Sequence, residues 1–146
     1  MKSTSGYLFM FDSGPFSWSS HKQTTTAQST AEAEYISAAA ASNQAIWLRK
    51  LLEDLGCKQP HATIIYCDNT SAIAITKNPV QHRRTKHIPV KYHSIREAER
   101  NKEIKLLHCS TQDQIADLLT KALPKEKFEK LRTLLHIMPN IAKEEC

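Results

Sequence analysis

An apolar strand and a polar turn are encoded side by side in Thr63-Ile64-Ile65-Tyr66-Cys67-Asp68-Asn69-Thr70. Residues 63–67 form a continuous apolar, β-branched run, which is typical of a strand buried on both faces of a sheet. The polar residues that follow stand at the end of that strand, where open α/β sheets place their binding sites. Residues 71–77 then predict a short helix that closes before Pro79.

The segments before this strand predict a hairpin and a long helix. Residues 7–11 are apolar, a Ser-Gly-Pro turn follows at 13–15, and residues 16–20 alternate large apolar side chains with serine, so they predict antiparallel strands. Residues 30–55 predict a helix, with Ser29 as N-cap and Glu32 completing a capping box. Leucines at 48, 51, 52 and 55 form a stripe at helical spacing, and Gly56 ends the helix.

The segments after the strand alternate again between the two kinds of element. Residues 88–101 predict a helix, residues 103–108 a second buried strand, and residues 110–123 a capped helix that Pro124 breaks. Residues 128–138 predict a final amphipathic helix. The chain therefore reads as one α/β domain over residues 1–138 with a frayed tail at 139–146.

Composition excludes several classes of protein. The chain has 146 residues, 40% hydrophobic and 24% charged, which suits one soluble globular domain with a single core. Three glycines are too few for a Gly-rich phosphate loop, and no apolar run is long enough to cross a membrane. The N-terminus lacks a signal-peptide core, so we expect an intracellular protein whose four dispersed cysteines are reduced, with no zinc site.

Three carboxylates stand in unusual places: Glu34 among apolar and small residues at a helix start, Asp68 at the exit of the buried strand, and Asp117 between apolar residues in the first turns of a helix. Carboxylates brought together from separate segments are typical ligands of hard cations such as Mg²⁺. Each also has a structural alternative. Glu34 could be a solvated acid at a helix start, Asp68 the N-cap of the next helix, and Asp117 a solvent-facing side chain. Glu32 is explained by the capping box and is not counted as catalytic.

The net charge of +5 comes from one segment. Residues 77–105 contain nine Lys or Arg and three Glu, a balance of +6, so the rest of the chain carries −1. Basic residues of this segment could bind phosphates without reading sequence, or could form an ordinary solvated helix face. The candidates are Lys77, Arg83, Arg84, Lys86 and Lys91. The tryptophans Trp18 and Trp47 are interpreted as core residues rather than base-stacking platforms.

Eight short blocks of this sequence recur together, in this order, in one family. They are Lys2–Tyr7, Ser17–Ser20, Ser29–Tyr35, Trp47–Leu52, Cys67–Ile73, Arg84–Ile88, Tyr92–Glu97 and Gln114–Lys121. With them the chain resembles the ribonuclease H domain at the C-terminal end of copia-type LTR retrotransposon polyproteins. The resemblance extends from Lys2 to about Leu135.

The resemblance implies a ribonuclease-H-like fold, a mixed five-stranded sheet flanked by helices. It implies hydrolysis of the RNA strand of an RNA/DNA hybrid during reverse transcription, at two Mg²⁺ ions for which Mn²⁺ can substitute. Glu34, Asp68 and Asp117 match three of the four acidic residues that bind these ions in the family. The partners implied are the hybrid and the rest of the polyprotein, including reverse transcriptase, in cytoplasmic particles or in the nucleus, with no membrane.

One departure from the family bears on activity. The first aspartate of the family lies on its first, central strand, which precedes the Lys2–Tyr7 block. We therefore expect this chain to lack both that strand and that aspartate; Asp12 is no substitute, because it falls in the predicted hairpin turn. The alternative to an active ribonuclease H is thus an inactive remnant that still binds nucleic acid or serves a structural role.

Overall fold

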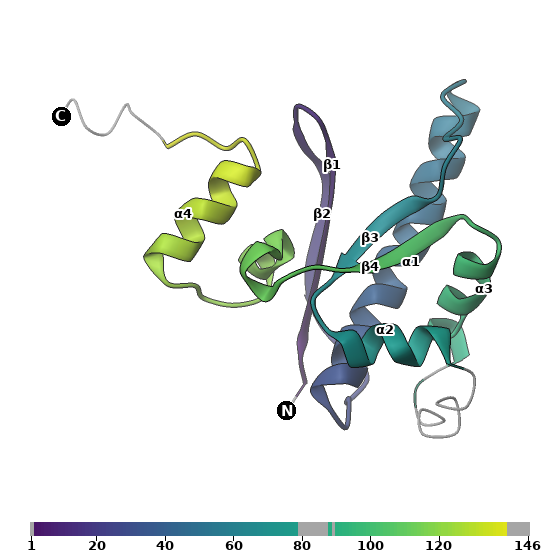
Figure 1. The fold of residues 1–146 in the computed structure, drawn as a ribbon, viewed down its shortest axis with the longest axis horizontal. Coiled ribbons are helices and arrows are strands. Elements are labelled where there is room, and N and C mark those ends of the chain that lie inside the picture. The colour runs from purple at the N-terminus through teal and green to yellow at the C-terminus, as the bar shows by residue number, and fades with distance from the viewer. Residues whose placement is uncertain (1, 79–87, 89, 140–146) are drawn as a thin grey trace.

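The computed structural model describes residues 2–78, 88 and 90–139. Within them the chain forms four α-helices, four strands and short 3₁₀ turns in a mixed α/β fold (Figure 1). The helices and strands are β1 (Thr4–Phe11), β2 (Gly14–Lys22), α1 (Thr30–Asp54), β3 (Thr63–Cys67), α2 (Thr70–Lys77), α3 (Ser94–Arg100), β4 (Ile104–His108) and α4 (Lys125–Leu134). The 3₁₀ turns are η2 (Val90–Tyr92), η3 (Thr111–Asp113) and η4 (Ile115–Leu119).

The strands pair in two separate sheets. β1 and β2 form the predicted antiparallel hairpin, with Thr4 opposite Lys22 and a bulge between Phe9 and Met10. β3 and β4 pair in parallel, with Thr63 opposite Ile104. The described residues therefore contain two two-stranded sheets rather than the one five-stranded sheet that the resemblance implied. Helices and strands of this kind and order are compatible with a ribonuclease-H-like fold.

The prediction that residues 63–67 are buried on both faces is wrong. Cys67 is buried and Ile65 packs against the core, but Ile64 is 47% and Tyr66 57% exposed. Only one face of β3 is covered, because α1 contacts it on that side and the described residues bring no layer over the other. The alternation of exposed and buried positions is that of a strand with one solvated face.

The long helix forms where it was predicted, and its start is well capped. The side-chain oxygen of Ser29 accepts a hydrogen bond from the Glu32 amide at 3.1 Å, and Glu32 Oε2 accepts one from the Gln28 amide at 2.7 Å. These bonds satisfy amides that have no partner within the helix. At the other end Gly56 has a φ of +81°, the left-handed conformation in which helices commonly stop.

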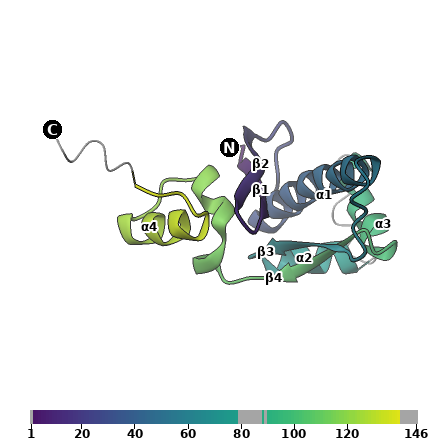
Figure 2. The same cartoon turned by 90° about the horizontal axis from the view of Figure 1, so that it is seen from above.

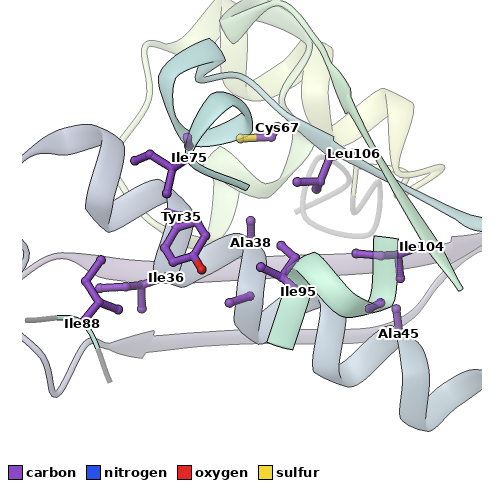
Figure 3. Packing of buried hydrophobic residues seen from close by; sticks show 13 residues of the cluster. Tyr35, Ile36, Ala38, Ala45, Cys67, Ile75, Ile88, Ile95, Ile104 and Leu106 are labelled. Carbon is purple, nitrogen blue, oxygen red and sulfur yellow. The ribbon is translucent and has the colours of Figure 1, made fainter. Parts of the chain in front are cut away.

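The core gathers around the first half of α1. Figure 3 shows that side chains of α1 pack against buried side chains of β3, α2, α3 and β4. The α1 residues labelled there are Tyr35, Ile36, Ala38 and Ala45. Their partners are Cys67 of β3, Ile75 of α2, Ile95 of α3, Ile104 and Leu106 of β4, and Ile88. Further along α1 the predicted leucine stripe is wrong in part, because Leu51 is 41% and Leu55 70% exposed.

The C-terminal third departs furthest from the predicted elements. The helix predicted over 88–101 begins only at Ser94, after the 3₁₀ turn η2. The helix predicted over 110–123 is wrong: Ser110 caps the Gln112 amide, and two short 3₁₀ turns follow. The last helix is α4, which contacts η4 and lies apart from α1, on the other side of the hairpin (Figure 1 and Figure 2).

Candidate functional site

The three predicted carboxylates come from three elements. Glu34 lies in the second turn of α1, Asp68 directly follows β3, and Asp117 lies in η4. Burial raises the pKa of the Glu34 carboxyl, and the charges of Asp68 and then Asp117 raise it further, while Lys121 lowers it. Glu34 is therefore within electrostatic reach of both other carboxylates. The two aspartates whose charges act on Glu34 are 34 and 83 positions away from it along the chain.

Asp68 is positioned by its neighbours on both sides. Before it, the Cys67 carbonyl accepts a hydrogen bond from the Cys109 amide at 3.0 Å, which continues the pairing of β3 with the strand beside it. After it, Asn69 caps α2, its Oδ1 accepting from the Ala72 amide at 2.9 Å. Asn69, not Asp68, is thus the N-cap of this helix. The carboxylate of Asp68 does not serve as the helix cap.

Asp117 is the most buried of the three, with 7% of the residue exposed. Its Oδ2 accepts from the Lys127 ammonium group at 3.1 Å and lies 3.2 Å from the Lys121 ammonium group. The solvent-facing alternative for Asp117 is therefore wrong. A buried carboxylate requires such partners because an isolated charge is costly to remove from water.

Two thiols share the neighbourhood of the carboxylates. Burial raises the pKa of the Cys67 thiol to about 11, and Glu34 and Asp68 contribute to the increase. Burial likewise raises the pKa of Cys109, followed by the charges of Asp68, Asp113 and Asp117. Both thiols are therefore protonated near pH 7. The charges of Asp68 and Asp117 both raise the pKa of Cys109. This is a second indication that these two carboxylates lie in the same region.

The donor chemistry of this cluster suits a hard cation, but its geometry is not that of a preformed site. Carboxylate oxygens are the ligands that Mg²⁺ prefers. In the part of the chain that the structure describes, however, no three His, Cys, Asp or Glu side chains form a group that could hold one metal ion. One oxygen of Asp117 already contacts two ammonium groups. The residues fit Mg²⁺ by kind and neighbourhood, and binding would require the carboxylates to draw together.

Three of the five predicted basic residues lie outside the described residues: Arg83, Arg84 and Lys86. Lys91 is described only through its backbone in η2. Lys77 ends α2, and its ammonium group lies 3.8 Å from Glu99 Oε1. Half of the Lys77 side chain remains exposed, so it is accessible to a phosphate while partly neutralised by Glu99.

The interpretation of both tryptophans as core residues is wrong. Trp18 on β2 is 61% exposed and Trp47 on α1 is 55% exposed. Near Trp18 the rings of Phe11 and Phe16 stack with centroids 4.0 Å apart at the tip of the hairpin. No described layer of the molecule covers these rings.

Three residues of the site were not identified from the sequence. Lys121 lies four positions after Asp117, a spacing that is typical of an ion pair along a helix. Lys127 follows the break at Pro124, and no spacing in the sequence links it to Asp117. Gln114 donates its side-chain amide to the Tyr66 carbonyl at 3.1 Å, linking η4 to β3. A side chain that acts across the fold in this way leaves no mark in the local sequence pattern.

No helix of the described residues has the length and apolar composition needed to cross a bilayer. No family model matches the chain, and no solved structure matches it either. Curated relatives do match. The chain is 45% identical over 139 residues, 95% of its length, to the retrovirus-related Pol polyprotein from transposon TNT 1-94 of Nicotiana tabacum. It is 43% identical over 127 residues, 87% of its length, to that from transposon RE2 of Arabidopsis thaliana.

A third relative, the Pol polyprotein from transposon RE1 of Arabidopsis thaliana, is 40% identical over 135 residues, 92% of the chain. The chain spans about a tenth of the length of these relatives: 10%, 9% and 9%. Identity of this size along almost the whole chain is not a local motif match. The chain is homologous to one segment of the retrovirus-related Pol polyproteins of plant transposons.

Proposed function

We propose that this chain is the ribonuclease H domain of a copia-type Pol polyprotein and hydrolyses the RNA strand of RNA/DNA hybrids. The observation that carries the proposal is that Glu34, which lines the cleft between the two sheets, lies within electrostatic range of Asp68 and Asp117 from two other elements. The electrostatic coupling of Glu34 to both aspartates supports it. Homology to the retrovirus-related Pol polyproteins of plant transposons also supports the proposal.

In this proposal Glu34, Asp68 and Asp117 hold two Mg²⁺ ions, or Mn²⁺ in their place. When bound, such ions would lower the pKa of the attacking water and stabilise the negative charge on the leaving 3′ oxygen. The three carboxylates act as ligands and transfer no proton. Lys121 and Lys127 neutralise Asp117 while no cation is bound, which keeps the repulsion among the acids small.

In this proposal the basic segment, residues 77–105, binds the hybrid. Lys77, Arg83, Arg84, Lys86 and Lys91 would contact phosphates, which gives affinity without base sequence preference. Preference for a hybrid would come from groove shape and the 2′-hydroxyl groups. The remainder of the polyprotein, including reverse transcriptase, would present the hybrid to this domain.

A second candidate is a domain that binds hybrids without cleaving them. It is favoured by the pairing of Asp117 with two lysines and by the lack of a three-ligand group among the described residues. Both candidates share the basic segment and differ only in whether the carboxylates bind metal. They are separated by measuring cleavage and binding on the same sample.

The test is cleavage of an end-labelled RNA/DNA hybrid in Mg²⁺ or Mn²⁺ by this chain and by Asp68→Asn. Cleavage that Asp68→Asn abolishes supports the enzyme. Binding that weakens as salt rises, without cleavage by either protein, supports the second candidate. A folded chain that neither cleaves nor binds the hybrid contradicts both.

A further inference from the structure

The second half of α1 presents an apolar stripe to solvent. Trp47, Leu51 and Leu55 follow one another at intervals of four residues, so they lie along one face of the helix. Their exposed fractions are 55%, 41% and 70%, whereas Ala45 and Leu48 of the same half are buried. Figure 1 shows this end of α1 extending beyond β3 and α3. The stripe therefore lies in the half of the helix that is away from the candidate site.

This stripe has the composition of a contact surface. Single exposed apolar residues are common, but a tryptophan and two leucines on one helix face form a continuous apolar area. Tryptophan is among the residues that most often dominate the free energy of binding at protein interfaces. Neither metal binding nor phosphate binding at the proposed site requires apolar side chains at these positions. Because no other element among the described residues covers the stripe, a protein partner is the occupant that its chemistry suits.

Two opposite charges flank the stripe and indicate which protein it suits. Lys50 and Asp54 are both exposed and lie four residues apart along one side of it. Within the part of the chain that the structure describes, neither lies within ion-pair distance of an opposite charge. A polyanion such as a nucleic acid would be attracted at Lys50 but repelled at Asp54. The electrostatic complement is an anion followed by a cation, which is what the same helix presents when it runs in the opposite direction.

We infer that two copies of this chain associate through their α1 helices, packed antiparallel about a two-fold axis at Leu51. Such an axis places Leu51 against Leu51 of the other copy, and Trp47 against Leu55 of the other copy. It also keeps the same side of both helices together, so Lys50 comes within two residues, about 3 Å along the axis, of Asp54 of the other copy. A parallel pair would instead oppose Lys50 with Lys50 and Asp54 with Asp54. The charges therefore favour the antiparallel arrangement.

The size of the surface predicts weak and reversible association. From their exposed fractions, the three apolar side chains offer about 300 Å² per copy for burial, given that a whole tryptophan buries about 150–250 Å². Because apolar area makes up about two thirds of a homodimer interface, two copies would bury about 900 Å² in total. Stable complexes bury at least about 1,200 Å², so we expect a dissociation constant between about 10 µM and 1 mM. The inference does not depend on the proposed function, because pairing of the helices needs neither metal nor hybrid.

The test is sedimentation velocity of the full chain in EDTA and a reductant, which keeps the exposed Cys57 from forming a disulfide. Between about 10 µM and 1 mM the weight-average sedimentation coefficient is expected to rise toward that of a dimer. Leu51→Gln should raise the dissociation constant at least about tenfold, whereas Leu134→Gln on α4 should leave it unchanged. The two leucines are matched in exposure, at 41% and 42%. A wild-type chain that stays monomeric at about 1 mM, or equal effects of the two variants, would overturn the inference.

Charge reversal tests the antiparallel pairing at exposed positions, without changing the apolar stripe. Lys50→Glu places two anions on the flank of each copy, and Asp54→Lys places two cations there. Each variant alone should dimerise at least about threefold more weakly, because the flanks of its two copies repel each other. An equimolar mixture of the two variants should recover the wild-type dissociation constant, since each flank then faces its complement. A mixture that associates no better than either variant alone would contradict the inference.

Discussion

The ammonium group of Lys127 lies 3.1 Å from Oδ2 of Asp117, with 14% and 10% of the two side chains exposed. Lys121 contacts the same oxygen from a more exposed position, with 52% of its side chain in solvent. This buried pair joins η4 to α4, which also reaches η3 through the Lys130 ammonium group, 2.8 Å from Asp113 Oδ1. Asp117 is thus both a candidate metal ligand and one of the residues that hold the last helix in place.

Removing Lys127 is expected to destabilise the fold. Among the described residues, Lys127→Met leaves the buried Asp117 carboxylate with Lys121 as its remaining ion-pair partner, so the free energy of unfolding should fall by about 1–3 kcal/mol. Urea unfolding in EDTA measures this change in the free energy of unfolding. Lys125→Met, at a side chain 87% exposed, is the matched control and should change stability by less than about 0.5 kcal/mol. Equal effects of the two variants would mean that the pair adds no stability.

The same variant is expected to bind divalent cations more tightly if the proposed metal site is correct. Lys127 competes with a cation for Asp117 Oδ2, so Lys127→Met should lower the dissociation constant for Mn²⁺ by about three- to tenfold. Asp68→Asn should raise it, because a carboxylate ligand is lost. Titration with Mn²⁺, followed by its electron paramagnetic resonance signal, gives both values. Unchanged affinity in both variants would argue against Asp117 and Asp68 as ligands.

Stability should depend on pH through Glu34. Its pKa is raised in the folded chain, first by burial and then by Asp68 and Asp117, above an unfolded value of about 4.3. The folded chain thus holds this proton more tightly, and the resulting stability is complete below the unfolded pKa and lost as pH rises through the folded one. Glu34→Gln should therefore stabilise the chain at pH 7.5 by about 0.5–2 kcal/mol.

The gain from Glu34→Gln should disappear near or below pH 4, where the wild-type carboxyl is protonated in both states. Urea unfolding of both proteins in EDTA at the two pH values measures the difference. Asp54→Asn, at the exposed end of α1, serves as a control for a general loss of negative charge. A gain that is equal at both pH values would mean that the charge of Glu34 is not responsible.

Arg49 should matter more than its exposed neighbour Lys50. Its guanidinium group donates to the His61 carbonyl at 2.7 Å, to Thr63 Oγ1 at 3.0 Å and to the Gln59 carbonyl at 3.3 Å. These bonds tie the segment between α1 and β3 back onto the helix. Arg49→Ala is expected to lower the free energy of unfolding by about 1–3 kcal/mol, and Lys50→Ala by less than about 0.5 kcal/mol. Thermal and urea unfolding of the two variants decide the comparison.

Elements with local signals were predicted well. The Ser29–Glu32 capping box and Gly56 delimit α1 because caps depend on residues a few positions apart. The predicted helix over 110–123 failed because Ser110 bonds to the Gln112 amide and the backbone continues in 3₁₀ turns, which allows Asp117 to meet Lys127 across Pro124. Local capping chemistry resembles that of a helix there, and only the tertiary contact distinguishes the two.

Burial was harder to predict than secondary structure. Ile64, Tyr66 and Trp18 are apolar enough for a core, yet each lies on a strand face that no described layer covers. Hydrophobic periodicity gives the faces of an element but not which neighbours cover them. The candidate carboxylates were chosen because an acid beside a buried strand or within an apolar helix is unusual in a sequence, whereas the lysines that neutralise Asp117 have the pattern of ordinary surface residues.

Gly6 of β1 packs closely against η4 and Thr120, the residue that follows it. A Cβ atom added there would lie 2.6 Å from Thr120 Cγ2 and 3.1 Å from Leu119 Cβ, closer than van der Waals contact allows. Gly6→Ala is therefore expected to destabilise the chain by about 1–3 kcal/mol, measured by urea unfolding. Thr120→Ser removes the clashing methyl group and should restore at least half of that loss in the double variant, while changing stability little alone. The restoration stays partial because Leu119 Cβ remains in place. Additive effects of the two substitutions would show that η4 does not pack on Gly6 in solution.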